Sequence, residues 1–297
     1  MTHSYRSLVD TPLTVIHAAF VAAFSDYSQP MHLTVADLAT MFETRSGSLA
    51  DSHGAFVDGA LVGFVLVGLR DIDGVRTGYD VATAVVPEHR GRGVATALLR
   101  HTLAALAGSG VRRFVLEVID TNDAAIRLYT RLGFEVQRAL ACYRWSKPAS
   151  DSVAAVSAPV HLDAVDERAW NGYRPSWQNA LPSYRVVAAT QRVVGFTVGG
   201  ELRGYGIVNP STGSIMQLGL HPEHQTDAAL RALIDQVAAQ TDAAGLRIVN
   251  VEAECRLATA LADAGWECFV RQFEMVLELR VVPVGGMFAG RRGSAPS

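Results

Sequence analysis

Apolar residues recur every three to four positions over residues 12–24 and 34–42, which predicts two helices near the start of the chain. Two short apolar runs follow at 54–57 and 61–66. They flank Asp58-Gly59, a dipeptide typical of tight hairpin turns. The pattern therefore predicts two helices followed by a β-hairpin.

Farther along, residues 79–86 and 113–119 are predominantly apolar and are expected to form strands. A helix is predicted between them, over residues 92–107. One face of this helix carries small and apolar side chains, namely Ala95, Leu98, Leu99, Thr102, Leu103 and Leu106. Another helix is expected to begin at Asn122 or Asp123 and to end at Gly133. This mixture of helices and strands predicts an α/β (α+β) fold.

Several motifs of the first half of the chain reappear in the second half. Val86-Pro87-Glu88-His89 returns 135 residues later as His221-Pro222-Glu223-His224. The same spacing relates residues 110–112 to 245–247 and residues 116–118 to 251–253, and a spacing of 132 relates residues 132–134 to 264–266. Matches in one order at nearly one spacing indicate an internal duplication.

The duplication predicts two domains, at residues 1–145 and 160–280. The stretch 146–159 is rich in Ser, Ala and Pro and has no amphipathic period, so it is expected to be a linker. Residues 281–297 are rich in Gly and Pro and are expected to form a flexible tail.

Composition narrows the class of protein. The chain has 297 residues, 49% of them hydrophobic, and is therefore expected to fold around a sizeable core. Its apolar runs fall short of the ~18 residues of a membrane span, and we expect no membrane association. The net charge of -3 argues against a nucleic-acid partner. Three cysteines without CxxC spacing fit a cytoplasmic protein without a cysteine-built metal site.

Candidate chemistry gathers where the strand 79–86 runs into the helix 92–107. Gly91 and Gly93 would let the backbone approach an anion closely, and the helix N-terminus would add partial positive charge. Arg90 and Arg92 would add fixed positive charge that suits phosphate. The turn is therefore predicted to be a pyrophosphate cradle.

Other phosphate-binding turns fit less well. A P-loop run GxxxxGK[ST] does not occur. A dinucleotide-binding turn would place its glycines directly after the strand, whereas residues 87–90 intervene and Thr96 stands at the position of the third glycine. Asp120 lies where a ribose-binding acid could sit, which is the one observation that favours that alternative.

Two motifs in order resemble a known family. Arg90-Gly91-Arg92-Gly93-Val94-Ala95 matches the [Q/R]-x-x-G-x-[G/A] motif of the GNAT superfamily of N-acetyltransferases. Leu116-Glu117-Val118, Asn122, Ala125, Tyr129 and Leu132-Gly133-Phe134 match its second signature. The whole chain resembles tandem GNAT proteins with an active N-terminal and a degenerate C-terminal copy. This resemblance implies two GNAT-like lobes, each a mixed, mostly antiparallel sheet flanked by helices.

The resemblance implies an acyltransferase that uses acetyl-CoA as co-substrate and no metal. The acetyl group would pass directly to a primary amine in a ternary complex. A small-molecule amine is the first expectation for the acceptor. A protein N-terminus or lysine, and a non-catalytic acyl-CoA-binding sensor, stay open as alternatives.

The resemblance also implies roles for individual residues. Tyr129 would donate a proton to the departing sulfur, and Glu117 would act as the base unless it is only a structural carboxylate. Val85 and Val86 would offer backbone groups to the cofactor arm, including the N–H of a β-bulge. The predicted cofactor-binding residues are Val85, Val86, Arg90, Gly91, Arg92, Gly93, Val94, Ala95, Thr96 and Asn122, the last of which also fits a helix N-cap. The predicted acceptor-site residues are Asp26, Tyr27 and Tyr79.

The second copy departs from the motif. Gln225, Ala228 and Leu230 stand where the first copy has Arg90, Gly93 and Ala95, and Leu257 and Leu261 replace Asn122 and Tyr129. Glu252 alone survives, at the position of Glu117. We therefore expect residues 160–280 not to bind acetyl-CoA but to shape the acceptor pocket or a homodimer contact.

Overall fold

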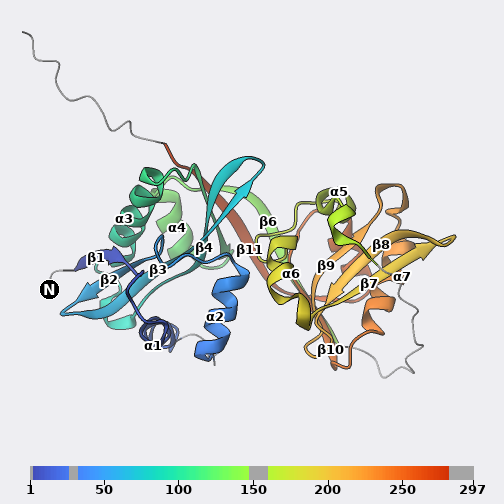
Figure 1. Cartoon of the computed structure of the whole chain (residues 1–297), viewed down its shortest axis with the longest axis horizontal. Helices are drawn as coiled ribbons and strands as arrows, with labels where there is room; N and C mark the ends of the chain where they lie inside the picture. Colours follow the sequence, from blue (N-terminus) through green and yellow to red (C-terminus); the bar gives the residue numbers. More distant parts are fainter. Residues whose placement is uncertain (1–2, 27–32, 147–159, 281–297) are drawn as a thin grey trace, which may run out of the picture.

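A computed structural model describes residues 3–26, 33–146 and 160–280 (Figure 1). Tyr27, the predicted linker beyond residue 146 and the predicted tail lie outside the described residues. We call residues 3–146 the N-terminal half and residues 160–280 the C-terminal half. The two halves lie side by side and are joined by long strands (Figure 1). No helix within these ranges is long and apolar enough to cross a membrane.

The N-terminal half has the helices and strands that its hydrophobic pattern predicts. They are β1 (Ser4–Ser7), α1 (Leu13–Ala23), α2 (Val35–Thr44), β2 (His53–Val57), β3 (Ala60–Ile72), β4 (Val75–Val85), α3 (Val94–Gly108), β5 (Arg113–Ile119), α4 (Asp123–Arg131) and β6 (Glu135–Ser146). The short β1 and the long β6 were not predicted. Strand β4 starts earlier than expected, because a tight turn with Asp73 and Gly74 at positive φ extends the β3–β4 hairpin.

The C-terminal half repeats much of this order. Its elements are α5 (Glu167–Asn171), α6 (Leu181–Val187), β7 (Arg192–Val198), β8 (Glu201–Val208), β9 (Ser214–Leu220), α7 (Asp227–Ala238), β10 (Gly245–Glu252), α8 (Arg256–Asp263) and β11 (Glu267–Glu278). Two short 3-10 helices, η1 (Pro87–His89) and η4 (Pro222–His224), stand at the two copies of the Pro-Glu-His motif. Equivalent motifs of the sequence thus occupy equivalent places in the fold.

All these strands form one eleven-stranded sheet. Its order is β1-β2-β3-β4-β5-β11-β6-β10-β9-β8-β7. The β4–β5 and β9–β10 pairs are parallel, and the other neighbouring strands run antiparallel. β11, the last strand of the C-terminal half, pairs with β5, and β6 pairs with β10. Each half therefore completes its sheet with a strand of the other half.

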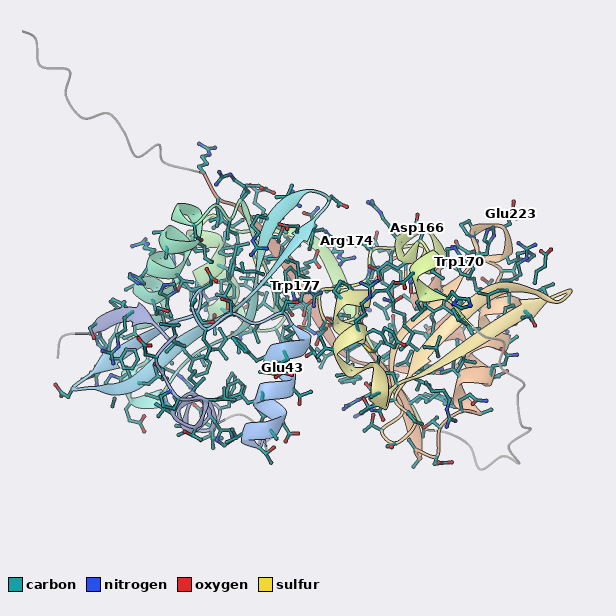
Figure 2. All side chains as sticks on the ribbon, in the orientation of Figure 1. Glu43, Asp166, Trp170, Arg174, Trp177 and Glu223 are labelled. Atoms are coloured by element: carbon teal, nitrogen blue, oxygen red, sulfur yellow. The ribbon has the colours of Figure 1, made fainter. Side chains whose placement is uncertain are left out.

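Helices cover both faces of the sheet, with α1 and α2 on one face of the N-terminal half and α3 and α4 on the other (Figure 1). Two main hydrophobic clusters fill the two halves. Trp177 comes from the C-terminal half, yet it packs in the cluster of the N-terminal half. With Arg174 it lies where the two halves meet (Figure 2).

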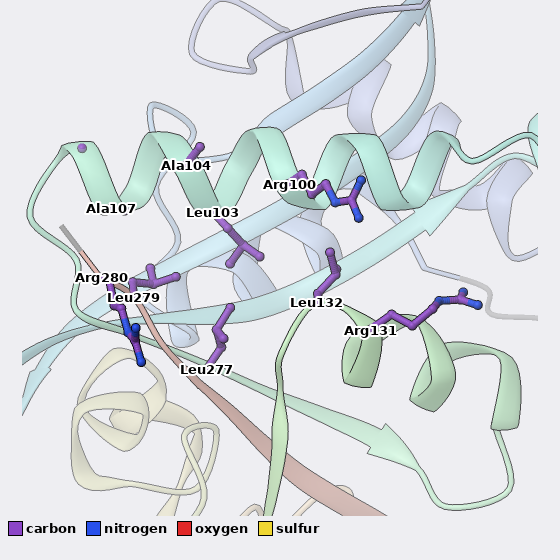
Figure 3. A pocket seen from close by; sticks show the side chains of 10 residues that line it. Arg100, Leu103, Ala104, Ala107, Arg131, Leu132, Leu277, Leu279 and Arg280 are labelled. Carbon is purple, nitrogen blue, oxygen red and sulfur yellow. The ribbon is translucent and has the colours of Figure 1, made fainter. Parts of the chain in front are cut away.

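The end of β11 also borders a cavity of about 750 Å³ beside α3 and α4 (Figure 3). Its floor is apolar, with Leu103, Leu132 and Leu277 facing one another. The apolar contact continues the core of the N-terminal half, to which Leu277 and Leu279 belong. Packing against α3 and α4 thus adds to the hydrogen bonds that hold β11 in the N-terminal half.

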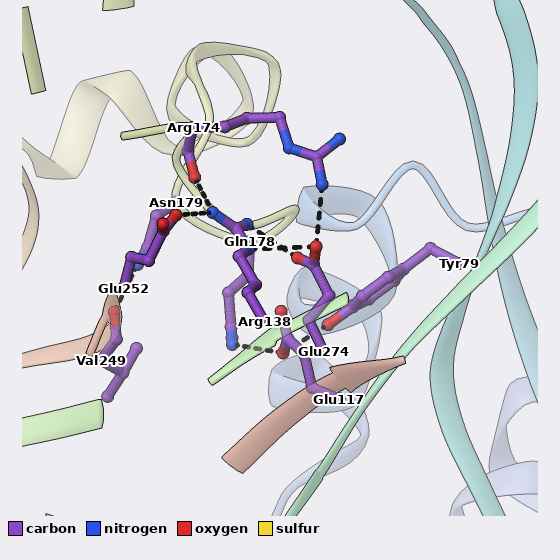
Figure 4. A network of polar contacts seen from close by, with 9 residues as sticks. All are labelled: Tyr79, Glu117, Arg138, Arg174, Gln178, Asn179, Val249, Glu252 and Glu274. Atoms are coloured by element: carbon purple, nitrogen blue, oxygen red, sulfur yellow. Dashed lines mark hydrogen bonds and ion pairs between the residues drawn. The ribbon is translucent and has the colours of Figure 1, made fainter. Parts of the chain in front are cut away.

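A buried ionic cluster joins the exchanged strands (Figure 4). Glu274 on β11 is only 2% exposed. It accepts two hydrogen bonds from Arg138 on β6, at 3.1 and 2.8 Å, and one from Arg174 at 2.8 Å. Arg138 also pairs with Glu252 on β10 at 2.9 Å. The cluster, consisting of Glu274, Arg138, Arg174 and Glu252, therefore fixes β6, β10 and β11 relative to one another.

Arg138→Met should lower the free energy of unfolding by about 3 kcal/mol, because it leaves the Glu274 carboxylate buried without its main partner. The measurement is urea denaturation at neutral pH. Arg144→Met is the matched control, since Arg144 pairs with Glu267 across the same two strands with both side chains about 60% exposed. Its cost should stay below about 1 kcal/mol. Equal costs for the two variants would contradict the importance of the buried cluster.

Candidate functional site

The parallel strands β4 and β5 separate in the middle of the sheet. Their register covers only Thr77–Tyr79 against Arg113–Val115. Beyond this point β5 continues along β11 as far as Ile119. Strand β4 instead carries a register shift at Val81, between the Val67–Asp80 and Leu66–Ala82 pairs. An opening between the carboxyl ends of parallel strands is a common position for ligand sites.

The predicted cradle follows β4 and η1. Gly91 and Gly93 have φ angles of 70° and 77°, a region that favours glycine. A Cβ atom added to either glycine would have no neighbour within 4 Å. Gly93 is the N-cap of α3 and supplies no capping side chain. Backbone N–H groups of the first turn of α3 are therefore available to an anion, and the exposed Arg92 lies beside them.

Arg90, which was predicted to face phosphate, makes contacts within the protein. Its Nε donates to the carbonyl oxygen of Val85 at 2.9 Å, and its guanidinium pairs with Asp26 at 2.6 Å. This hydrogen bond to Arg90 lowers the pKa of Asp26. The side chain thus fastens the turn to the end of α1, and Asp26 neutralises the charge that we expected to face phosphate.

The equivalent turn of the C-terminal half leads into a helix whose N-terminus is capped. Gln225 donates to the carbonyl oxygen of Leu220 at 3.2 Å, so it repeats the contact of Arg90 with Val85. Thr226 caps α7 by accepting from the N–H of Ala229 at 3.2 Å. Asp227 places a negative charge in the first turn. A capped helix start with an acidic residue disfavours a bound anion.

Val85 and Val86, which were predicted to offer backbone groups to the cofactor arm, lie where β4 ends beside the cradle. The N–H of Val86 donates to Val62 at 3.0 Å, and the carbonyl of Val85 accepts from Arg90. The irregularity of β4 lies at Val81, because β4 is in register with β3 on both sides of that residue. The extra residue of a bulge has no partner in the register, and here that residue is Val81.

Two other predicted residues lie on α4. Asn122 is its N-cap, and its Oδ1 accepts from the N–H of Ala125 at 3.2 Å. The N-cap interpretation is confirmed by this contact. Tyr129 is 8% exposed and packs edge-on against Phe134 with ring centres 5.6 Å apart. Its ring belongs to the core, as its helical stripe predicts.

Glu117 lies on the face of the sheet that meets the C-terminal half (Figure 4). Its Oε2 accepts from the hydroxyl of Tyr79 at 3.0 Å and from Nε2 of Gln178 at 3.1 Å. Burial, with Glu274 directly opposite on β11, raises the pKa of Glu117 to about 7. Predicted residues Tyr79 and Glu117 are thus brought together, whereas Asp26 lies with Arg90 at the cradle.

A second buried carboxyl stands on β4 next to Tyr79. Asp80 accepts from the hydroxyl of Thr83 at 2.7 Å. Burial raises the pKa of Asp80 to about 7. Within the described ranges, no group of three or more His, Cys, Asp or Glu side chains is placed to hold a metal ion.

Several neighbours of Glu117 were missed by sequence reasoning. Trp177 stacks on Tyr79 with ring centres 4.9 Å apart and planes at 5°, and Gln178 follows it. Arg45, at the end of α2, donates to Gln178 at 2.9 Å. None of these residues belongs to a motif. The one available signal was a tryptophan in the segment 174–180, which has no other large apolar residue.

Comparison with known proteins finds a family match in the N-terminal half. Residues 14–134 match the model of the Acetyltransferase (GNAT) family. The chain is 32% identical to a mycothiol acetyltransferase of Frankia alni over 145 residues, which is 45% of this chain and 43% of that protein. It is 42% identical to the N-alpha-acetyltransferase 30 of Schizosaccharomyces pombe over 57 residues, 19% of this chain and 38% of that protein. The matches thus span less than half the length of these relatives.

Solved structures resemble both halves together. A putative acetyltransferase from Pyrococcus horikoshii superposes with a TM-score of 0.66 at 12% identity, over 94% of this chain and 90% of that one. A GCN5-related N-acetyltransferase from Sphaerobacter thermophilus gives 0.67 at 14%, over 94% and 96%. A tandem GNAT protein from the clavulanic acid biosynthesis pathway gives 0.63 at 17%, over 94% and 99%. At these identities the likeness shows the fold, a mixed α/β sheet flanked by helices.

The raised pKa of Glu117 predicts a pH-dependent stability. The folded chain holds this proton up to about pH 7, whereas the ordinary pKa is 4.5. The contribution of Glu117 to stability is therefore full below pH 4.5 and is lost as the pH rises through 7. Glu117→Gln should reduce the fall in unfolding free energy between about pH 5 and 8 by about 3 kcal/mol, as measured by urea denaturation. An unaltered pH dependence would contradict the shift.

Proposed function

We propose that the GNAT acetyltransferase domain at residues 14–134 makes this chain an acetyl-CoA-dependent N-acetyltransferase acting on a primary amine. The observation that carries this proposal is the open cradle at Gly91 and Gly93 beside the opening between β4 and β5. The pyrophosphate and the thioester arm belong to the same acetyl-CoA molecule. The cradle for one and the opening for the other must therefore lie next to each other.

The described residues fit the co-substrate. Backbone N–H groups from Gly91 to Thr96, with Arg92, would hold the pyrophosphate at the start of α3. The arm would enter the opening between β4 and β5. There the N–H of Val81, the residue without a Cα partner on β3, would face the thioester oxygen as negative charge develops on it, in place of the expected N–H of Val86.

Two proton transfers would accompany the transfer of the acetyl group. The amine nitrogen forms a bond to the acetyl carbon, and the carbon–sulfur bond breaks. Glu117 takes the proton that the nitrogen loses, and Tyr129 donates to the departing sulfur. A carboxyl with a pKa of about 7 suits a base at neutral pH better than an ordinary glutamate does. A thiol has a pKa of ~8.5 and a tyrosine a pKa of ~10, so full proton transfer from Tyr129 to the thiolate is slightly unfavourable. This difference limits how much Tyr129 can contribute to the rate as an acid.

The acceptor is proposed to be a small molecule. Trp177 and Gln178 of the C-terminal half cover the face of the sheet where Tyr79 and Glu117 meet, which supports a confined acceptor over a long peptide. The local similarity to an N-alpha-acetyltransferase keeps a protein N-terminus as the second candidate. The amine can be identified by measuring thiol release from acetyl-CoA with a panel of amino acids, polyamines, aminoglycosides and peptides.

We further propose that the protein acts in the cytoplasm.

Gly93→Asp tests the cradle. Aspartate tolerates positive φ, so the fold should persist, but its carboxylate would repel the phosphates. The dissociation constant of acetyl-CoA in calorimetry should rise at least about tenfold. Ala228→Asp, at the equivalent exposed position of the C-terminal half, is the matched control and should leave it unchanged. Unchanged affinity in Gly93→Asp would overturn the assignment of the cradle.

Tyr129→Phe tests the proton donor. This substitution should lower kcat by up to ~10²–10⁴-fold and leave the KM for acetyl-CoA nearly unchanged, because it removes only the hydroxyl. Steady-state thiol release is the measurement. Tyr184→Phe on α6 serves as a control for loss of a tyrosine hydroxyl elsewhere. A kcat equal to that of the wild type would remove Tyr129 from the mechanism.

A further inference from the structure

Trp177 and Gln178 belong to the C-terminal half, but their side chains contact residues of the N-terminal half. The indole N–H of Trp177 donates to the carbonyl of Arg45 at 2.8 Å, and its carbonyl accepts from Arg70 at 2.7 Å. The Arg70 guanidinium also lies 4.5 Å above the Trp177 ring. With the stack on Tyr79, these contacts fix the backbone that carries Gln178.

The contacts of Gln178 determine which way its amide points. Arg45 has only donors, so the atom of Gln178 that accepts from it must be the carbonyl oxygen. The amide nitrogen is therefore turned toward Glu117, to which it donates at 3.1 Å. A chain of hydrogen bonds thus runs from Arg45 through Gln178 to Glu117.

The two oxygens of Glu117 have different surroundings. Oε2 accepts from both Tyr79 and Gln178. Oε1 is buried and accepts no direct hydrogen bond among the described residues, although the side chain of Asn250 on β10 is close enough to lower the pKa of Glu117. A buried carboxylate oxygen without a donor is more basic than one that accepts two hydrogen bonds.

From this arrangement we propose that Gln178 is a positioning residue that occupies Oε2 of Glu117 and thereby presents Oε1 to the proton of the acceptor amine. The inference rests on the function proposed above and adds that the C-terminal half takes part in the chemistry of the N-terminal half. Gln178 touches neither reacting atom, so it acts only through Glu117.

The charged and titratable groups around Glu117 come from four elements. Tyr79 on β4 donates to it, and Glu274 on β11 opposes its ionisation. Arg45 after α2 favours the ionised form, and Cys142 on β6 lies within electrostatic range. Without the Gln178 donor the ionised carboxylate is less stable, so the pKa of Glu117 rises.

The test compares Gln178→Leu, Glu117→Gln and the double variant of the full chain. With the amine that the panel identifies, Gln178→Leu should lower kcat about tenfold, leave the KM for acetyl-CoA unchanged and move the acidic limb of the kcat profile to higher pH. In the Glu117→Gln background it should have no further effect on kcat. Gln191→Leu, whose amide contacts its neighbour Thr190, is the matched control.

A second measurement does not require turnover. In urea denaturation, the loss of stability with rising pH should extend to higher pH in Gln178→Leu than in the wild type. An unchanged kcat and pH dependence in Gln178→Leu would overturn the proposal, as would an equal loss in the Glu117→Gln background. If instead Glu117→Gln alone keeps full kcat, the base assigned under the proposed function fails, and this outcome is distinct from the others.

Discussion

The other features of the structure depend on one interaction, the pairing of β11 with β5 on one side and with β6 on the other. It brings Glu274 opposite Glu117 and directly beside Arg138, so that one strand links the buried ionic cluster to the candidate base. Glu274 is compensated by two arginines, whereas Glu117 receives only neutral donors. The carboxyl without a cationic partner is the one whose pKa rises, which suits it to accept a proton at neutral pH.

The two halves have a similar order of helices and strands but differ at the turn that is proposed to bind phosphate. In both, a side chain after the 3-10 helix is fastened to the carbonyl at the end of the preceding strand, through Arg90 or Gln225. The N-terminal half then begins its helix with an uncapped glycine, and the C-terminal half with a capping threonine and an aspartate. The arginine of the motif therefore holds the turn against the end of the strand, as Gln225 does in the C-terminal half.

Much of the fold could be predicted from the sequence, because hydrophobic periodicity and turn residues are local signals. The helix at 92–107, the hairpin at Asp58-Gly59 and the N-cap Asn122 are of this kind. The exchange of β6 and β11 could not be predicted, since either strand can pair in its own half or in the other with the same pattern. The Gln178–Glu117 contact and the Arg90–Asp26 pair join residues far apart in sequence, for which the chain carries no periodic signal.

The strand exchange also sets the order of events during synthesis. Strand β5 ends at Ile119, but its partner β11 ends at Glu278, so the ribosome must add more than a hundred residues before the sheet of the N-terminal half can close. Such long-range pairing slows folding. Until then one edge of β5 is unpaired, and exposed edges are sites of aggregation. In a nascent chain, this edge of β5 therefore lacks its native partner until β11 has been synthesised.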